Sequence, residues 1–229
     1  GMLNAFEKLE KSVPFAISVT IEESGKTLAG QDIVAFYASC EHMNPLYIGI
    51  NCAVGPDLMK GPLQALNKVS KFPISLVPNA GMPNDQGKYD LTEAGFAEIL
   101  GKYMKDGLVN VVGGCCGTTP AHIQLLSKFA YKPQFNKTWE LNILSGVDSL
   151  VIEPEKCYVV GERANVIGSR IFKGLISDEK FEEAAEIAKQ QIKAGADIID
   201  ICVSNPDRDE KDDIESLLGF VSKFVKVPL

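Results

Sequence analysis

The run Val-Val-Gly-Gly-Cys-Cys-Gly-Thr-Thr-Pro, from Val111 to Pro120, decides how this chain folds and what it can bind. Adjacent side chains of a regular strand point to opposite faces, so both sulfurs reach one point only after the strand has ended. Gly117 and the glycines before the cysteines allow the backbone to turn there, because glycine adopts positive φ without penalty. Thr119 and Pro120 then predict a helix start, with a hydroxyl N-cap and proline in the first turn.

A third cysteine has the same setting. The apolar run from Tyr47 to Cys52 ends in Asn-Cys and is followed by Gly55 and Pro56. Three thiolates around one point are best suited to zinc, and three protein ligands leave a fourth position for water or substrate. The spacing differs from zinc fingers, whose cysteines come in short pairs. For Cys52 alone, the role of a small buried hydrophobe stays open.

Strand-like apolar runs alternate with helical patterns along the chain. Runs this continuous indicate strands buried on both faces, which is typical of a parallel sheet. Before residue 131 we expect strands at 15–21, 46–51, 74–78 and 108–112, and helices at 31–39, 57–69, 92–105 and 120–130. The periodicity lapses at 131–156, which predicts a linker. It resumes with strands at 158–160 and 198–202 and helices at 178–194 and 212–225.

The cysteine motifs resemble a known family. Gly-Ile-Asn-Cys ending at Cys52, followed by Gly-Gly-Cys-Cys-Gly-Thr-Thr-Pro, is similar to the zinc-dependent homocysteine S-methyltransferases. Within them, the chain most resembles the homocysteine module of the cobalamin-dependent methionine synthases. Val-Val-Gly-Glu-Arg-Ala-Asn-Val-Ile-Gly-Ser, at 159–169, looks like the opening of the methyltetrahydrofolate (pterin) module that follows in those enzymes.

The resemblance implies an α/β fold of the parallel (β/α) barrel type, with functional residues at the carboxyl ends of the strands. We expect two consecutive, incomplete TIM-barrel-like units. Residues 1–130 would be the C-terminal part of a homocysteine-binding zinc (β/α)8 barrel, 131–156 a linker, and 157–229 the N-terminal part of a pterin-binding (β/α)8 barrel. One barrel takes about 250 residues, so the sequence predicts an internal fragment of a longer enzyme or a degenerate relative.

In the zinc half, the resemblance implies roles for several residues. The metal ligands would be Cys52, Cys115 and Cys116, with Asn79 of the Pro-Asn-Ala-Gly segment as a weak oxygen ligand. A turn asparagine is an equal alternative for Asn79. The substrate-binding residues would be Thr20, Glu22, Gly113 and Gly114, although a surface carboxylate is the ordinary role for Glu22. We predict a structural role for His122, in the first turn of a helix.

In the second half, the pterin-binding residues would be Asn165, Gly168, Ser169 and Asp200. Family members commonly carry an asparagine two residues after the aspartate, where this chain has Cys202. A thiol does not reproduce the two-sided hydrogen bonding of an amide, so pterin chemistry is less firmly implied. We interpret Cys40 and Cys157 as core or surface thiols without a role in the motifs.

The implied function is a methionine synthase-like homocysteine S-methyltransferase. Zinc activates the homocysteine thiol for attack on a methyl group that methylcobalamin and methyltetrahydrofolate supply. The implied partners are homocysteine, methyltetrahydrofolate and a corrinoid-binding domain or protein, together with another chain or the missing enzyme portion. Two alternatives are a corrinoid-dependent methyltransferase component for another thiol and a non-catalytic zinc-binding scaffold module.

Composition is consistent with this interpretation. The net charge of −7 argues against nucleic acid or an anionic membrane as a partner. No apolar run approaches the roughly 18 residues of a membrane span. No signal peptide is visible, so we expect a cytoplasmic enzyme whose six cysteines serve metal binding or the core instead of disulfides.

Overall fold

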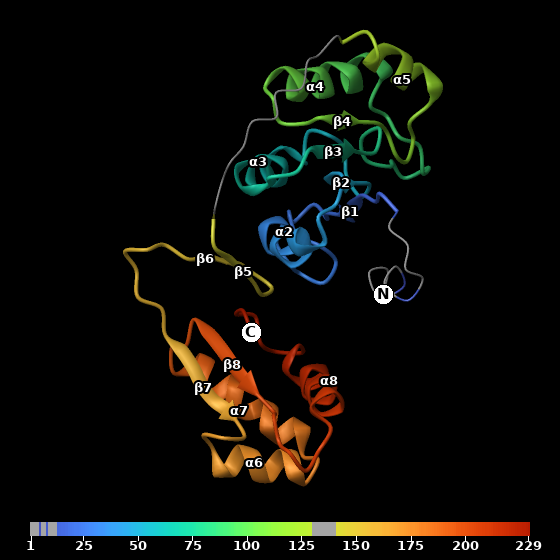
Figure 1. Ribbon diagram of the computed structural model, residues 1–229. Helices are drawn as coiled ribbons and strands as arrows, with labels where there is room; N and C mark the ends of the chain where they lie inside the picture. The colour runs from blue at the N-terminus through green and yellow to red at the C-terminus, as the bar shows by residue number, and fades with distance from the viewer. Residues whose placement is uncertain (1–4, 6–7, 9–12, 130–140) are drawn as a thin grey trace. The chain divides into compact units, whose positions relative to one another are not determined.

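A computed structural model describes residues 5, 8, 13–129 and 141–229 of the chain. The chain divides into two compact units, residues 1–141 and residues 142–229 (Figure 1). Each unit has its own parallel strands, and the helices of each unit pack on those strands.

The first unit contains a parallel sheet of four strands in the order of the sequence. The strands are β1 (Ile17–Thr20), β2 (Ile48–Asn51), β3 (Ile74–Val77) and β4 (Val111–Val112). Register pairs Thr20 with Asn51 and Asn51 with Val77, so these three strands end side by side. In a parallel sheet, the residues that follow each strand therefore gather at one edge.

Helices follow the strands. They are α2 (Ile33–Cys40), α3 (Lys60–Val69), α4 (Glu93–Lys105) and α5 (Pro120–Leu126), with a 3-10 turn η1 (Glu41–Met43) after α2. Helix α2 packs against α3, and α4 packs against α5 (Figure 1). The first three residues of each central strand, β2 and β3, are buried whichever face they point to, as is typical of a parallel sheet.

The second unit begins with an antiparallel hairpin of β5 (Ile143–Ser145) and β6 (Ser149–Val151). Strands β7 (Val160–Asn165) and β8 (Ile198–Cys202) then pair in parallel. The helices are α6 (Arg170–Ser177), α7 (Phe181–Lys193) and α8 (Glu210–Val221). Beyond α8, the N–H of Ile199 donates to the carbonyl of Pro228 at 3.0 Å, so the last residues lie along β8.

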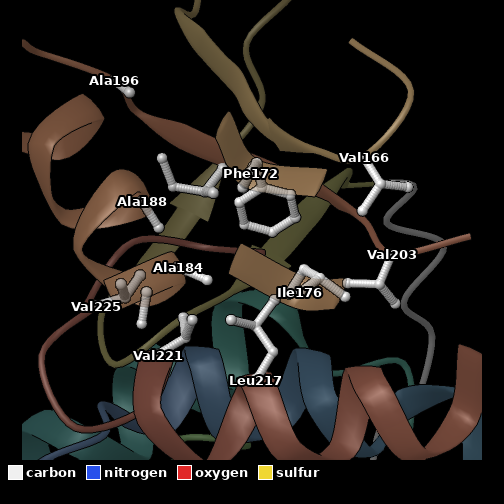
Figure 2. Packing of buried hydrophobic residues seen from close by; sticks show 13 residues of the cluster. Val166, Phe172, Ile176, Ala184, Ala188, Ala196, Val203, Leu217, Val221 and Val225 are labelled. Atoms are coloured by element: carbon white, nitrogen blue, oxygen red, sulfur yellow. The ribbon is translucent and has the colours of Figure 1, made fainter. Parts of the chain in front are cut away.

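The core of the second unit is built from all three helices (Figure 2). Phe172 and Ile176 of α6 are fully buried and meet Leu217 of α8. Helix α7 contributes only small side chains at its buried positions, which are Ala184, Ala185 and Ala188. Small side chains let a helix axis approach the strands closely, and the larger fully buried side chains come from α6, α8 and strand β8, which contributes Ile199.

The structure confirms the predicted α/β class with parallel sheets. Within the described residues the sheets are open, and none closes into a barrel. Two elements differ from the sequence prediction. The apolar alternation predicted no helix at the position of α6. It also predicted no hairpin at residues 143–151, because these residues fall within the predicted linker. Residues 131–140 of that linker lie outside the described residues, and the domain boundaries stay a prediction. Across the described part of the chain, every helix is too short or too polar to cross a lipid bilayer.

We expect that Phe172→Ala destabilises the second unit by about 3–5 kcal/mol, because it removes a fully buried aromatic ring and leaves a cavity. The adjacent Ile171 is the matched control, since its side chain is 74% exposed and Ile171→Ala should cost less than about 0.5 kcal/mol. Urea unfolding of both variants measures the difference. Equal decreases in the free energy of unfolding in the two variants would show that α6 does not anchor this core.

Candidate metal centre

Cys52 is the first residue after β2, and its backbone leaves the strand in a left-handed turn. Cys52 has φ 59° and Ala53 has φ 56°. Positive φ is uncommon outside glycine and marks a position that the surrounding structure holds in place. The Cys52 N–H donates to the carbonyl of Val77 at 3.0 Å, which ties this turn to the end of β3.

Cys115 and Cys116 follow β4, on the other side of β3. The Cys115 N–H donates to the carbonyl of Pro78 at 2.8 Å. The Cys116 N–H donates to Oδ1 of Asn79 at 3.1 Å, and the Cys116 carbonyl accepts the N–H of Ala80 at 2.9 Å. The backbone of both cysteines is therefore fixed by the residues that end β3.

The three sulfurs converge over the end of β3. Sγ of Cys116 lies 3.6 Å from Sγ of Cys52 and 3.9 Å from Sγ of Cys115, and all three sulfurs lie within 4.8 Å of one another. All three cysteines are free thiols. Tetrahedral thiolates at about 2.3 Å from zinc lie about 3.8 Å apart. The donor set and its spacing thus fit a zinc ion with one further position.

The three thiols differ in acidity. Cys52 has a lowered pKa, chiefly because its sulfur accepts the backbone N–H of Ala53. The pKa of Cys115 is raised to about 11, first by loss of hydration and then by its hydrogen bonds with the other two sulfurs. A metal binds thiolates, so loading this cluster releases protons, and affinity for the metal falls as pH falls.

Asn79 lies beneath the cysteines and is almost fully buried. Its side-chain oxygen accepts the N–H of Cys116 at 3.1 Å, and its backbone N–H donates to the carbonyl of Val54 at 3.1 Å. Through its side chain and its backbone, this residue therefore joins the cysteine turn after β4 to the turn after β2. Its predicted role as an oxygen ligand stays a prediction, next to this positioning role.

Tyr89 is a residue of the cluster that sequence reasoning missed. A Cβ placed on Gly117 would lie 2.3 Å from Cγ of Tyr89, so the ring occupies the place of a side chain at 117. The pKa of the Tyr89 phenol is raised by loss of hydration and by its hydrogen bond with Cys116. Nothing local in the sequence marks this tyrosine, because it comes from the segment between β3 and α4.

The helix start predicted after the cysteines is confirmed. Thr119 is the N-cap of α5 and Pro120 its first residue. His122 is buried, and its Nδ1 accepts the N–H of Thr119 at 3.1 Å, which leaves Nε2 to donate to the carbonyl of Leu91 at 3.3 Å. This histidine holds α5 in place and is not part of the sulfur cluster.

The predicted substrate-binding residues lie at the same edge of the sheet. Thr20 ends β1, and its hydroxyl accepts the side-chain amide of Asn51, the residue before Cys52, at 3.3 Å. Glu22 is in an exposed turn two residues further on. Gly113 and Gly114 connect β4 to the cysteines, and a Cβ on Gly114 would lie 2.4 Å from the side chain of Thr118. Their contact with substrate stays a prediction.

The predicted pterin-binding residues lie around the carboxyl end of β7 and in β8. Oδ1 of Asn165 accepts the N–H groups of Ile167 at 2.8 Å and Gly168 at 3.1 Å, which closes a local turn. Ser169 is the N-cap of α6 and accepts the N–H of Phe172. Asp200 lies on an exposed face of β8. Asn165 and Ser169 thus have structural roles that pattern matching did not predict.

The remaining cysteines lie outside the sulfur cluster. Cys40 is buried at the end of α2, and Cys157 is exposed before β7. Cys202 ends β8 opposite Asn165, at the position where the sequence resemblance implied an asparagine.

A parallel α/β sheet with a trio of thiols at its carboxyl edge defines a candidate metal-binding α/β protein. The family model described as homocysteine S-methyltransferase matches residues 1–130, and the model described as pterin binding enzyme matches residues 161–228. Because the first match spans more than half of the chain, this chain belongs to the homocysteine S-methyltransferase family.

Among solved structures, the chain is similar to the homocysteine methyltransferase MmuM from Escherichia coli in its oxidized form. The two are 21% identical with a TM-score of 0.43, and the match covers 56% of this chain. The chain spans 40% of the length of that protein.

We expect the chain purified without chelator to carry about one zinc ion, and Cys115→Ala to lose most of it. Loss of a partner outside the ligand set already costs about 10–100-fold in metal affinity, so loss of a thiolate costs at least as much. Elemental analysis measures the number of zinc ions per chain in the parent protein and in the variant. Cys157→Ala is the control, because this exposed thiol lies outside the cluster. Unchanged zinc in Cys115→Ala would contradict the assignment.

Proposed function

We propose that this chain carries the zinc and homocysteine portion of a cobalamin-dependent methyltransferase of the methionine synthase type, followed by part of its folate-binding portion. The observation that carries the proposal is the convergence of Cys52, Cys115 and Cys116 at one edge of the sheet. The match of residues 161–228 to pterin-binding enzymes supports the second portion.

The three thiolates would hold zinc and leave one position for the sulfur of homocysteine. Zinc in such a set supplies the Lewis acidity that keeps a substrate thiol ionised near neutral pH. The sulfur of the ionised substrate donates an electron pair to the methyl carbon. The methyl group leaves its donor without the bonding pair, and the product is a thioether.

The protein's own residues hold this geometry before substrate arrives. The side chain of Asn79 and the carbonyls of Val77 and Pro78 fix the backbone of all three cysteines. Thr20, Glu22, Gly113 and Gly114 lie along the same edge, where they can receive the amino acid portion of homocysteine. A site that is positioned in advance spends less binding energy on ordering its groups.

Methyltetrahydrofolate and methylcobalamin are the proposed sources of the methyl group. The pterin would lie at the carboxyl edge of β7 and β8, near Asn165 and Asp200, and a corrinoid-binding domain or protein would deliver the methyl group to the thiol. Three thiols that must stay reduced to hold a metal favour a reducing compartment such as the cytoplasm.

Homocysteine should change the sulfur shell of zinc in this chain from three sulfurs toward four. X-ray absorption at the zinc edge, with and without homocysteine, measures the number of sulfur neighbours. Homoserine is the matched control, since it differs only in carrying oxygen in place of sulfur. A shell that stays at three sulfurs with saturating homocysteine would refute substrate coordination, even where zinc itself binds.

Methyltetrahydrofolate binding should be strengthened about tenfold by Cys202→Asn, because an amide supplies both a donor and an acceptor where a thiol offers only weak ones. Calorimetric titration compares this variant with the parent chain. Cys157→Asn introduces the same side chain at an exposed site before β7 and should leave binding unchanged. Equal affinity in all three proteins would remove position 202 from the proposed pterin site.

A further inference from the structure

Tyr89 brings a side-chain hydroxyl to the sulfur cluster. This hydroxyl forms a hydrogen bond with the sulfur of Cys116, the exposed member of the three cysteines. The sulfur of Cys52, by contrast, accepts a backbone N–H, that of Ala53. A thiolate that holds a metal has no proton of its own. In the pair of Tyr89 and Cys116, the phenol is therefore the donor once the cluster is loaded.

The packing of the Tyr89 ring fixes this hydroxyl independently of the hydrogen bond. Gly117 follows Cys116 directly, and three atoms of Tyr89 would lie 2.3–2.6 Å from a Cβ placed on this glycine. The ring thus fills the space of a side chain at position 117. Because the ring lies against the residue next to Cys116, the phenol stays beside the cluster.

The segment that carries Tyr89 is held on both sides of this residue. Before it, Oδ1 of Asn84 accepts two backbone N–H groups of the same turn at 3.0 Å each. After it, the N–H of Leu91 donates to the carbonyl of Ala80 at 3.1 Å. The N–H of Ala80 donates in turn to the carbonyl of Cys116 at 2.9 Å. The segment and the cysteine turn therefore share one residue, and the phenol is positioned before a metal arrives.

The charge of the loaded site determines what this hydrogen bond contributes. Three thiolates exceed the charge of a zinc ion by one negative charge, and a substrate thiolate at the fourth position brings a second. Mutual repulsion of the sulfurs opposes that step. A donor to one of the sulfurs withdraws part of the negative charge, and hydrogen bonds to ionised groups are about twice as strong as those between neutral groups. A neutral fourth ligand adds no charge and gains less from the donor.

We infer that Tyr89 is a positioning residue of the metal centre, whose hydroxyl donates to the metal-bound sulfur of Cys116 and thereby favours an ionised thiol at the fourth position over a neutral ligand. The inference rests on the proposed function and deepens it, because it names a residue outside the ligand set that selects the charge of the substrate. Tyr89 acts through Cys116, and its role requires no contact with the substrate.

The test uses the full 229-residue chain loaded with cobalt(II), whose thiolate charge-transfer absorption reports on the sulfur ligands. Tyr89→Phe keeps the ring against Gly117 and removes only the hydroxyl. We expect the charge-transfer band to move to lower energy, because the sulfur of Cys116 becomes a stronger electron donor. Zinc affinity, measured by competition with a chelator, should fall about tenfold. Tyr47→Phe is the matched control, because Tyr47 precedes β2 and Cys52 follows that strand at its other end.

Two ligands of the loaded chain then separate selection from packing. Homocysteine affinity should fall about threefold to tenfold in Tyr89→Phe, whereas the affinity for imidazole, a neutral ligand, should change less than about twofold. Equal losses for both ligands would overturn the inference and leave the tyrosine a packing role. An unshifted band, with zinc affinity equal to that of Tyr47→Phe, would overturn it as well. A parent chain that binds neither metal would refute the proposed function itself, and the role of Tyr89 with it.

Discussion

Four hydrogen bonds to the residues that end β3 hold the three cysteines of the candidate metal centre together. The backbone groups of Cys52, Cys115 and Cys116 all bond to the segment 77–80, through carbonyls, an N–H and the side chain of Asn79. Because two turns far apart in the sequence share this one segment, the sulfurs of Cys52 and Cys116 come within 3.6 Å of each other. A hydrogen bond contributes only about 0.5–1.5 kcal/mol, whereas a buried backbone group that loses its partner costs about 1–3 kcal/mol.

In the first unit, much was predictable because the information is local. Apolar runs showed the strands, and the Thr-Thr-Pro sequence showed where α5 begins, since capping depends on neighbours in the chain. The convergence of the three cysteines followed from the rule that parallel strands end at a common edge. The roles of Asn79 and Tyr89 were not predictable, because their partners come from other elements and no local pattern records them.

The second unit shows a different limit. Helix α6 is eight residues long and starts soon after strand β7. Its apolar pattern covers too few residues to be recognised as helical in the sequence. The hairpin at 143–151 has strands of three residues, which no alternation reveals. Asn165 and Ser169 were correctly placed near the strand end, but their oxygens serve a turn and a helix cap. Their contact with a pterin stays a prediction.

The contact between Gly117 and Tyr89 ties the cysteine turn to a second segment of the chain. Gly117 has φ +77°, and a Cβ on it would lie 2.3 Å from Cγ and 2.4 Å from Cβ of Tyr89, so both the backbone conformation and the neighbouring residue exclude a side chain at 117. Position 117 therefore stays glycine as long as the 81–91 segment lies against it. For the same reason the Cys-Cys-Gly sequence is not portable by itself, and a scaffold that receives it must also receive the strand end and the 81–91 segment.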